Sequence, residues 1–165
     1  GEKKLDKKEG SLKELYDFCL HQLEGQYPQI KSWVQISIDQ PLSEKKFVYD
    51  SFHLKGAFVE VLKNSVFFNR SSEIKIDLHI FEEDGHIIFD IKDNGLGIQE
   101  ENYEKIFDLL WVGPYSRDLK SSGLGTGLTI AQGIVKLHGG QIFVKESLLQ
   151  EGTTLRIKMP LKGWS

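Results

Sequence analysis

The chain has 165 residues, of which 39% are hydrophobic and 27% are charged, and its formal net charge is −3. This composition is typical of one soluble globular domain and excludes a disulfide-stabilised scaffold, because Cys19 is the only cysteine. No run approaches the roughly 18 consecutive apolar residues of a membrane-spanning helix. No cluster of basic and aromatic residues indicates a nucleic-acid surface.

The first half of the chain begins with residues 1–10, which are charged at almost every position and predict a linker or a leader. The folded domain is expected over residues 11–165. Apolar residues at a spacing of three and four predict a helix over residues 11–25. A strand is expected over residues 33–38, and a long buried helix over residues 52–68.

The second half begins with an alternating segment, residues 74–80, and an apolar segment, residues 87–91, which predict a hairpin turning at Asp84-Gly85. A short helix is expected at residues 102–110, and the Gly- and Ser-rich residues 113–125 predict a loop. The last expected elements are a helix over residues 128–137 and two strands over residues 141–146 and 153–159. This order implies one sheet covered by a layer of helices.

Two polar residues, Glu60 and Asn64, interrupt the apolar pattern of the long helix. They are four positions apart, so both side chains project from one helix face. A carboxylate and a carboxamide offer the oxygen ligands that Mg²⁺ prefers. The alternative is the polar edge of an ordinary amphipathic helix.

The segment Asp-Asn-Gly-Leu-Gly-Ile at residues 93–98 directly follows a predicted strand. Its glycines permit tight turning and close approach of the backbone to a planar ligand. Asp93 can accept a hydrogen bond from an exocyclic amine such as that of adenine. A plain turn between two elements is the alternative.

Two further segments follow in the chain. Glu-Lys-Ile-Phe at residues 104–107 leads into the predicted loop, and Gly-Leu-Gly-Thr-Gly-Leu at residues 123–128 leads into a helix. Glycines before a helix expose backbone amides, and the helix dipole favours anions there. The absence of a following lysine excludes a Walker P-loop. A loop with a helix cap is the simpler alternative.

The order of these four segments resembles the N box, first glycine box, F box and second glycine box of histidine kinase catalytic domains. The resemblance runs from about residue 11 to the end of the chain. It implies the α/β fold of the gyrase, histidine kinase and MutL superfamily. That fold is a two-layer α/β sandwich with a mixed, mostly antiparallel sheet, about three helices and a mobile ATP lid at about residues 109–124.

The resemblance also implies ATP and Mg²⁺ as cofactors. Glu60 and Asn64 would be catalytic residues and metal ligands, and Asp93 would bind the adenine amine. The glycines of the second glycine box would hinge the lid and face the phosphates. The expected nucleotide-binding residues are Asn64, Phe68, Asp93, Gly95, Gly97, Ile98, Phe107, Arg117, Lys120, Gly123, Leu124, Gly125, Thr126, Gly127 and Leu128.

The chain departs from the family pattern at two positions. Histidine kinases usually have Asn where this chain has Glu60, and a phosphate-facing Lys where it has Phe67. The candidates to replace that positive charge are Lys63, Arg70, Arg117 and Lys120. Arg117 and Lys120 are favoured because they would lie in the lid.

The expected function is that of the ATP-binding catalytic domain of a two-component sensor histidine kinase. Its phosphoryl acceptor would be a histidine in a separate dimerisation domain, because none of the five histidines matches an acceptor context and His138 matches a packing position. A response regulator is a further candidate partner. The domain is expected to be cytoplasmic, monomeric and free of nucleic-acid or membrane contact, with any inner-membrane anchor in the parent protein.

Three other functions remain open from the sequence. An anti-sigma-type serine kinase shares the fold and approximate size. A gyrase- or MutL-like ATPase would use Glu60 as the general base that activates water. A non-catalytic nucleotide-sensing domain would account for the missing lysine at Phe67.

Overall fold

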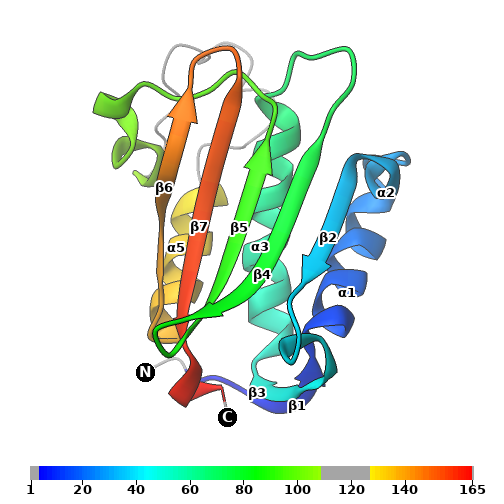
Figure 1. Cartoon of the computed structure of the whole chain (residues 1–165), viewed down its shortest axis with the longest axis vertical. Coiled ribbons are helices and arrows are strands. Elements are labelled where there is room, and N and C mark those ends of the chain that lie inside the picture. Colours follow the sequence, from blue (N-terminus) through cyan, green and yellow to red (C-terminus); the bar gives the residue numbers. More distant parts are fainter. Residues whose placement is uncertain (1–3, 109–126, 165) are drawn as a thin grey trace.

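The computed structural model describes residues 4–108 and 127–164, which form a sheet with helices packed on one of its faces (Figure 1). The helices are α1 (Leu12–Glu24), α2 (Ile30–Trp33), α3 (Ser51–Phe67) and α5 (Gly127–Leu137). The strands are β1 (Lys8–Ser11), β2 (Val34–Ile38), β3 (Lys46–Tyr49), β4 (Ile76–Glu83), β5 (His86–Asp93), β6 (Gln141–Leu148) and β7 (Gly152–Pro160). Short 3-10 turns are η1 (Leu42–Glu44), η2 (Glu100–Asn102), η3 (Lys105–Phe107) and η6 (Leu161–Gly163).

The main sheet has five strands in the order β2-β4-β5-β7-β6. The β2–β4 pair is parallel, and the other three pairs are antiparallel. The β4–β5 hairpin turns at Asp84 (φ 48°) and Gly85 (φ 72°), as the Asp-Gly signal predicts for a two-residue turn. The expected mixed, mostly antiparallel sheet is therefore confirmed.

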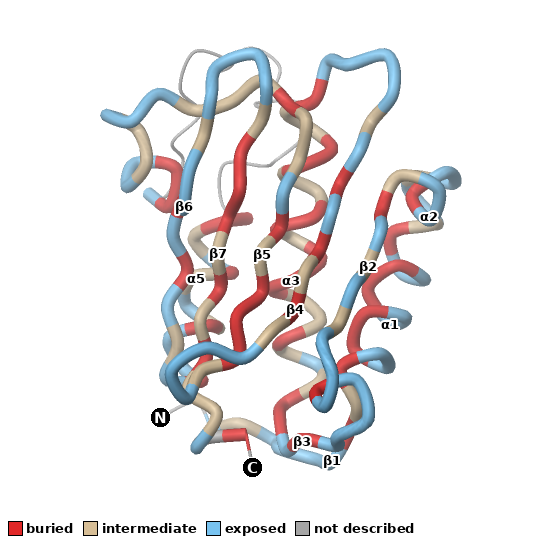
Figure 2. The backbone as a smooth tube through the Cα atoms, in the orientation of Figure 1, coloured by how far each residue is buried: buried red, intermediate tan, exposed pale blue. Residues whose placement is uncertain are grey.

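The core lies between the sheet and the three long helices α1, α3 and α5. Figure 2 shows buried residues in all three of these helices and in the central strands β4, β5 and β7. Phe58 of α3 and Phe89 of β5 are buried, with ring centroids 5.0 Å apart. Contacts of this kind hold β5 against α3, and these two elements carry the candidate site.

Several elements differ from the sequence-based expectation. Residues 8–10, expected in the charged leader, belong to β1, which pairs antiparallel with β3. The sequence shows no strand pattern here, because Gly10 is the only buried residue of β1 and has no apolar side chain. A Cβ on Gly10 would lie 2.7 Å from the Tyr49 hydroxyl. Trp33 ends helix α2 instead of starting a strand. The helix expected at residues 102–110 is absent from its described part, residues 102–108, where the structure has the turns η2 and η3.

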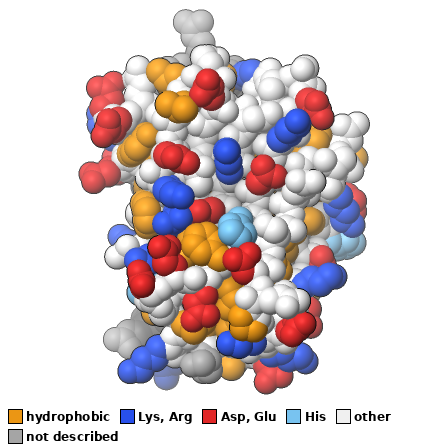
Figure 3. All heavy atoms as spheres, in the orientation of Figure 1, with side chains coloured by type: hydrophobic (Ala, Val, Ile, Leu, Met, Phe, Trp, Pro, Cys, Tyr) orange, Lys and Arg blue, Asp and Glu red, His pale blue; other side chains and the backbone are white. Residues whose placement is uncertain are grey.

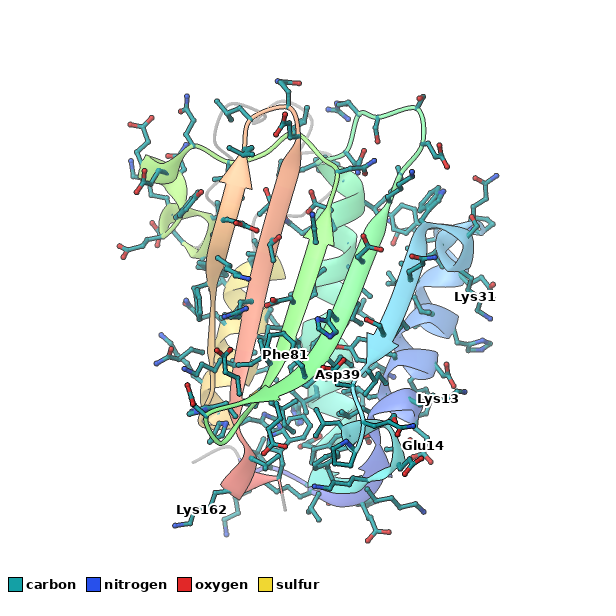
Figure 4. All side chains as sticks on the ribbon, viewed as in Figure 1. Lys13, Glu14, Lys31, Asp39, Phe81 and Lys162 are labelled. Atoms are coloured by element: carbon teal, nitrogen blue, oxygen red, sulfur yellow. The ribbon has the colours of Figure 1, made fainter. Side chains whose placement is uncertain are left out.

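None of the helices in the described residues packs on the opposite face of the sheet, where side chains of the strands contact one another. Arg156 makes two hydrogen bonds of 2.8 Å to Asp90, and its guanidinium lies 5.6 Å from the Phe81 ring centroid. His79 stacks on Phe81 and contacts Asp39 at 2.9 Å. Phe81 and Asp39 are labelled in Figure 4, and Figure 3 shows apolar groups enclosed by charged ones on this face.

Candidate nucleotide site at the end of β5

Asp93 is the last residue of β5, and its carboxylate turns toward α3 and β7. Oδ1 accepts hydrogen bonds from the backbone amides of Gly95 at 2.9 Å and Thr153 at 3.2 Å. The Ser65 hydroxyl of α3 is buried and interacts with the same carboxylate, and it donates a hydrogen bond of 3.3 Å to the Val61 carbonyl oxygen. A carboxylate has about four lone-pair sites, so acceptor capacity remains for a donor on a ligand.

The surroundings of the Asp93 carboxyl raise its pKa. Burial raises the pKa of the Asp93 carboxyl, and the hydrogen bonds from Gly95, Thr153 and Ser65 only partly oppose this effect. A partly desolvated carboxylate that is held by two backbone amides is a selective acceptor, because a ligand without a hydrogen-bond donor does not compensate for the water that the carboxylate has lost. This arrangement suits recognition of an amine.

The glycines of residues 93–98 are required by the packing of the loop itself. A Cβ on Gly95 would lie 2.6 Å from the carbonyl oxygen of Phe68, which accepts a hydrogen bond from Leu96 at 2.9 Å. Gly97 has φ of +79°, and a Cβ there would overlap the carbonyl oxygen of Leu148. The loop therefore lies directly on the end of α3 and on β6. Close approach to a ligand remains a prediction for both glycines.

Two further side chains hold this loop in place. Asn94 accepts hydrogen bonds from Asn69 at 2.7 Å and from the Lys75 amide at 2.9 Å. Ser147 of β6 accepts from the Ile98 amide at 2.7 Å. Ser65 and Ser147 were not predicted as site residues, because a serine in a helix or on a strand carries no recognisable motif.

The structure places both candidate metal ligands, Glu60 and Asn64, on α3, and metal binding by them stays a prediction. Glu60 and Asn64 are both partly buried and lie one helical turn apart. A Cβ on Gly127 would lie 2.5 Å from Glu60 Oε2, which places this carboxylate beside the first residue of α5. Lys63 Nζ lies 3.8 Å from Glu60 Oε1.

The donor set on α3 fits Mg²⁺ in part. A carboxylate and a carboxamide are oxygen ligands, and Mg²⁺ in nucleotide sites takes one or two protein ligands together with phosphates and waters. Within residues 4–108 and 127–164, no three His, Cys, Asp or Glu side chains gather as a metal-binding group. A magnesium ion held by Glu60 and Asn64 would therefore depend on the nucleotide for its other ligands.

The apolar residues expected at the site mainly pack the core. Phe107 and Leu128 are buried, and the Phe107 carbonyl accepts a hydrogen bond from the Thr129 hydroxyl at 2.8 Å. This bond ties the turn η3 to the first turn of α5. Ile98 is partly buried against the core, and the Phe68 ring lies 5.2 Å from that of Phe67.

Six of the expected residues lie outside the described part of the chain. They are Arg117, Lys120, Gly123, Leu124, Gly125 and Thr126. Their expected roles in the lid and at the phosphates stay predictions. The structure thus brings together Asp93, Gly95 and Gly97 at one part of the site, and Glu60, Asn64 and Gly127 at another.

His138 follows α5 and is buried, which confirms the packing role predicted for it. Nδ1 contacts the Ile134 carbonyl oxygen at 2.9 Å, so the neutral tautomer carries its proton on Nδ1. Burial lowers the pKa of the His138 imidazole, which favours this neutral form. His138 therefore supports the fold.

Proteins with related sequences are sensor kinases. The chain is 34% identical over 89 residues to the sensor histidine kinase WalK of Bacillus subtilis, a match that covers 54% of this chain and 14% of WalK. It is 45% identical over 75 residues to the signal transduction histidine-protein kinase ArlS of Staphylococcus epidermidis, covering 46% of this chain and 16% of ArlS. The chain thus spans less than a fifth of each of these relatives.

Solved structures with similar folds are kinase domains. The mycobacterial sensor histidine kinase MprB superposes with a TM-score of 0.74 at 21% identity, over 93% of this chain and 97% of that one. The catalytic domain of histidine kinase ThkA gives a TM-score of 0.73 at 20% identity, over 94% and 96%. At these identities the likeness confirms the expected fold.

None of the described helices is both long and apolar enough to cross a membrane.

Residues 49–163 match the family model described as histidine kinase-, DNA gyrase B- and HSP90-like ATPase. This match covers most of the chain and includes both α3 and the end of β5. The chain therefore belongs to the histidine kinase-, DNA gyrase B- and HSP90-like ATPase family.

Proposed function

We propose that this chain is the ATP-binding catalytic domain of a two-component sensor histidine kinase. It transfers the γ-phosphoryl group of Mg-ATP to a histidine in a separate dimerisation domain of the parent protein. The observation that carries this proposal is the Asp93 carboxylate, which is held by the Gly95 and Thr153 amides beside a glycine loop. The names of the related proteins support a kinase within the family.

In this proposal the residues of the chain mainly position the nucleotide. Asp93 accepts a hydrogen bond from the adenine amine, and the loop at residues 94–98 contacts the base. Glu60 and Asn64 orient the phosphates through Mg²⁺, which neutralises charge that develops during phosphoryl transfer. The amides that begin α5 at Gly127 favour a phosphate group nearby.

The partners and location belong to the same proposal. The acceptor histidine lies in the parent's dimerisation domain, and a response regulator receives the phosphoryl group afterwards. We place the domain in the cytoplasm, where ATP is available, with any membrane anchor in another part of the parent protein.

A second candidate function is ATP hydrolysis with Glu60 as the general base. It is favoured by the position of Glu60 Oε2 beside Gly127, since a carboxylate at the phosphate end could activate a water molecule. The two functions differ in a measurable way. Steady ATP hydrolysis by the chain alone, abolished in Glu60→Gln, would favour the ATPase over the kinase.

The first experiment is calorimetric titration of a non-hydrolysable ATP analogue with Mg²⁺ into the wild type, Asp93→Ala and Asp90→Ala. Asp90 is the control because it lies on the same strand and is paired with Arg156 on the open face. We expect binding to the wild type and Asp90→Ala, and no measurable binding to Asp93→Ala. Equal binding to all three folded proteins would exclude the proposed adenine site.

The second experiment adds the parent's dimerisation domain and follows transfer of labelled phosphate from ATP. Acid-labile, base-stable labelling of that domain is the result expected for phosphohistidine. Tight nucleotide binding with no transfer would leave a nucleotide-sensing domain as the better description.

A further inference from the structure

Three polar side chains share one face of α3 at the candidate site. Glu60, Lys63 and Asn64 follow the spacing i, i+3 and i+4, which places side chains next to each other on a helix. The Lys63 ammonium lies 3.8 Å from Glu60, and the side chains of this pair are only 25% and 24% exposed. Lys63 therefore lies on the same helix face as the proposed metal ligands, and its ammonium group is partly shielded from solvent.

Glu60 links this face to the beginning of α5. Its Oε2 lies 2.5 Å from the position of a Cβ on Gly127, while Lys63 contacts the other oxygen, Oε1. The first turn of α5 contains no acidic residue of its own. A negative group is favoured at the amino end of a helix, so the Glu60 carboxylate occupies a place that also suits a phosphate.

The only other lysine of α3, Lys55, is directed to a different surface. Its ammonium lies 5.2 Å from the ring centroid of Phe18 and 5.6 Å from that of Phe52, as expected for cation–π contacts. Of the two lysines on α3, only Lys63 lies beside the residues that would bind metal and phosphate.

We propose that Lys63 contacts the terminal phosphate of the bound nucleotide. This inference rests on the proposed function, because it requires ATP at the site. The incoming phosphate replaces Glu60 as the partner of the Lys63 ammonium, and Glu60 becomes available to Mg²⁺ or water. Ammonium–phosphate contacts are charge-assisted hydrogen bonds and are stronger than neutral ones. Among the described residues, α3 itself thus supplies a cation to this site.

Helix geometry gives a way to test the position of this charge. Phe67 is four residues beyond Lys63 and lies on the same helix face. A lysine introduced at position 67 can reach the same region from the next turn. Loss of charge at position 63 should therefore be repaired by a new charge at position 67.

The experiment compares a non-hydrolysable ATP analogue and ADP, each with Mg²⁺, by calorimetric titration. The proteins are the wild type, Lys63→Met, Lys63→Arg, Lys55→Met and the double variant Lys63→Met/Phe67→Lys. We expect Lys63→Met to lower the affinity for the ATP analogue about tenfold and the affinity for ADP by less than about threefold. This difference corresponds to one lost charge-assisted contact at the terminal phosphate. Lys63→Arg and the double variant should recover the preference for the ATP analogue, and Lys55→Met should keep wild-type affinities.

Other results would overturn the inference. An unchanged ratio of the two affinities in a folded Lys63→Met would show that Lys63 does not contact the terminal phosphate, even if the wild type binds ATP normally. Wild-type protein that binds neither nucleotide would instead overturn the proposed function, and the inference with it. Thermal unfolding of each variant checks the fold, and Lys63→Gln replaces Lys63→Met if the latter does not fold.

Discussion

The carboxylate of Asp93 accepts a hydrogen bond from the backbone amide of Thr153 at 3.2 Å, although the two residues are 60 positions apart in the sequence. This contact joins the end of β5 to the beginning of β7. Gly152 precedes Thr153 with φ of +134°, and a Cβ there would overlap the carbonyl oxygen of Asp93. The orientation of the proposed adenine-binding carboxylate therefore depends on the start of the last strand.

Nucleotide binding should weaken as the pH falls, because a protonated Asp93 loses acceptor capacity. Burial raises the pKa of Asp93, so binding is present above this raised pKa and is lost as the pH falls through it. The loss should begin at a higher pH than for an exposed aspartate. Titrations of the wild type from pH 7 to pH 4 measure this effect. Asp93→Asn should bind more weakly at neutral pH, with a flat profile; a sloping profile in that variant would assign the pH dependence to another group.

Gly152→Ala should destabilise the domain and disturb the site together. A left-handed backbone conformation in a non-glycine residue costs about 1–3 kcal/mol, and the overlap with the Asp93 carbonyl adds to this cost. We expect the free energy of unfolding in urea to fall by about 3 kcal/mol or more. The matched control is Gly133→Ala in α5, where a Cβ meets no atom within 4 Å. That change should stabilise the domain by about 0.5–1 kcal/mol through helix propensity.

Gly127→Ala should lower the rate of phosphoryl transfer more than the affinity for nucleotide. The new Cβ would lie 2.5 Å from Glu60 Oε2, so the flexible carboxylate has to move away from the start of α5. We expect the single-turnover rate with the dimerisation domain to fall by about tenfold, as for loss of one positioned charged group. Gly56→Ala in α3 is the control, because a Cβ there meets no atom within 4 Å. An unchanged rate of phosphoryl transfer in Gly127→Ala would show that the position of the Glu60 carboxylate does not affect catalysis.

The stability of the domain should decrease on the acid side of neutrality because of His138. Burial lowers the pKa of His138 in the folded state, and the unfolded state has a pKa of about 6.5. The unfolded chain therefore binds more protons below about pH 6.5, and stability falls there by at most about 1.4 kcal/mol per pH unit. Thermal unfolding between pH 7.5 and 5 measures the slope, and His138→Leu should reduce it.

Asp50 lies near His138 and also titrates, but its effect on stability falls in a different pH range. The charges that act on His138 are those of Asp50, Lys7 and His53. Burial by itself would raise the pKa of Asp50, but hydrogen bonds from His53 and from the Asp6 amide outweigh it and the pKa is lowered. Stability from Asp50 is therefore lost only as the pH falls below its ordinary pKa of about 4, well below the range assigned to His138.

The sequence alone determined the elements with strong periodicity. The apolar stripe of α1, the Asp84-Gly85 turn and the alternation in β4 are local patterns, and the structure confirms them. The motif at residues 93–98 and the pair Glu60 and Asn64 were also evident, because unusual residues stood out against an apolar background. A pattern within a few residues is sufficient for such features, since helix and strand periods repeat over short distances.

Other features were decided only by the tertiary structure. β1 was concealed among charged residues, because its pairing comes from β3, more than 30 positions away in the sequence. Ser65, Ser147 and Thr153 became part of the site only when α3, β6 and β7 came together around β5. The Lys63–Glu60 contact belongs to α3, but its position beside Gly127 depends on how α3 and α5 pack. These contacts join residues far apart in the chain, and sheet register and helix packing determine them, which no local pattern encodes.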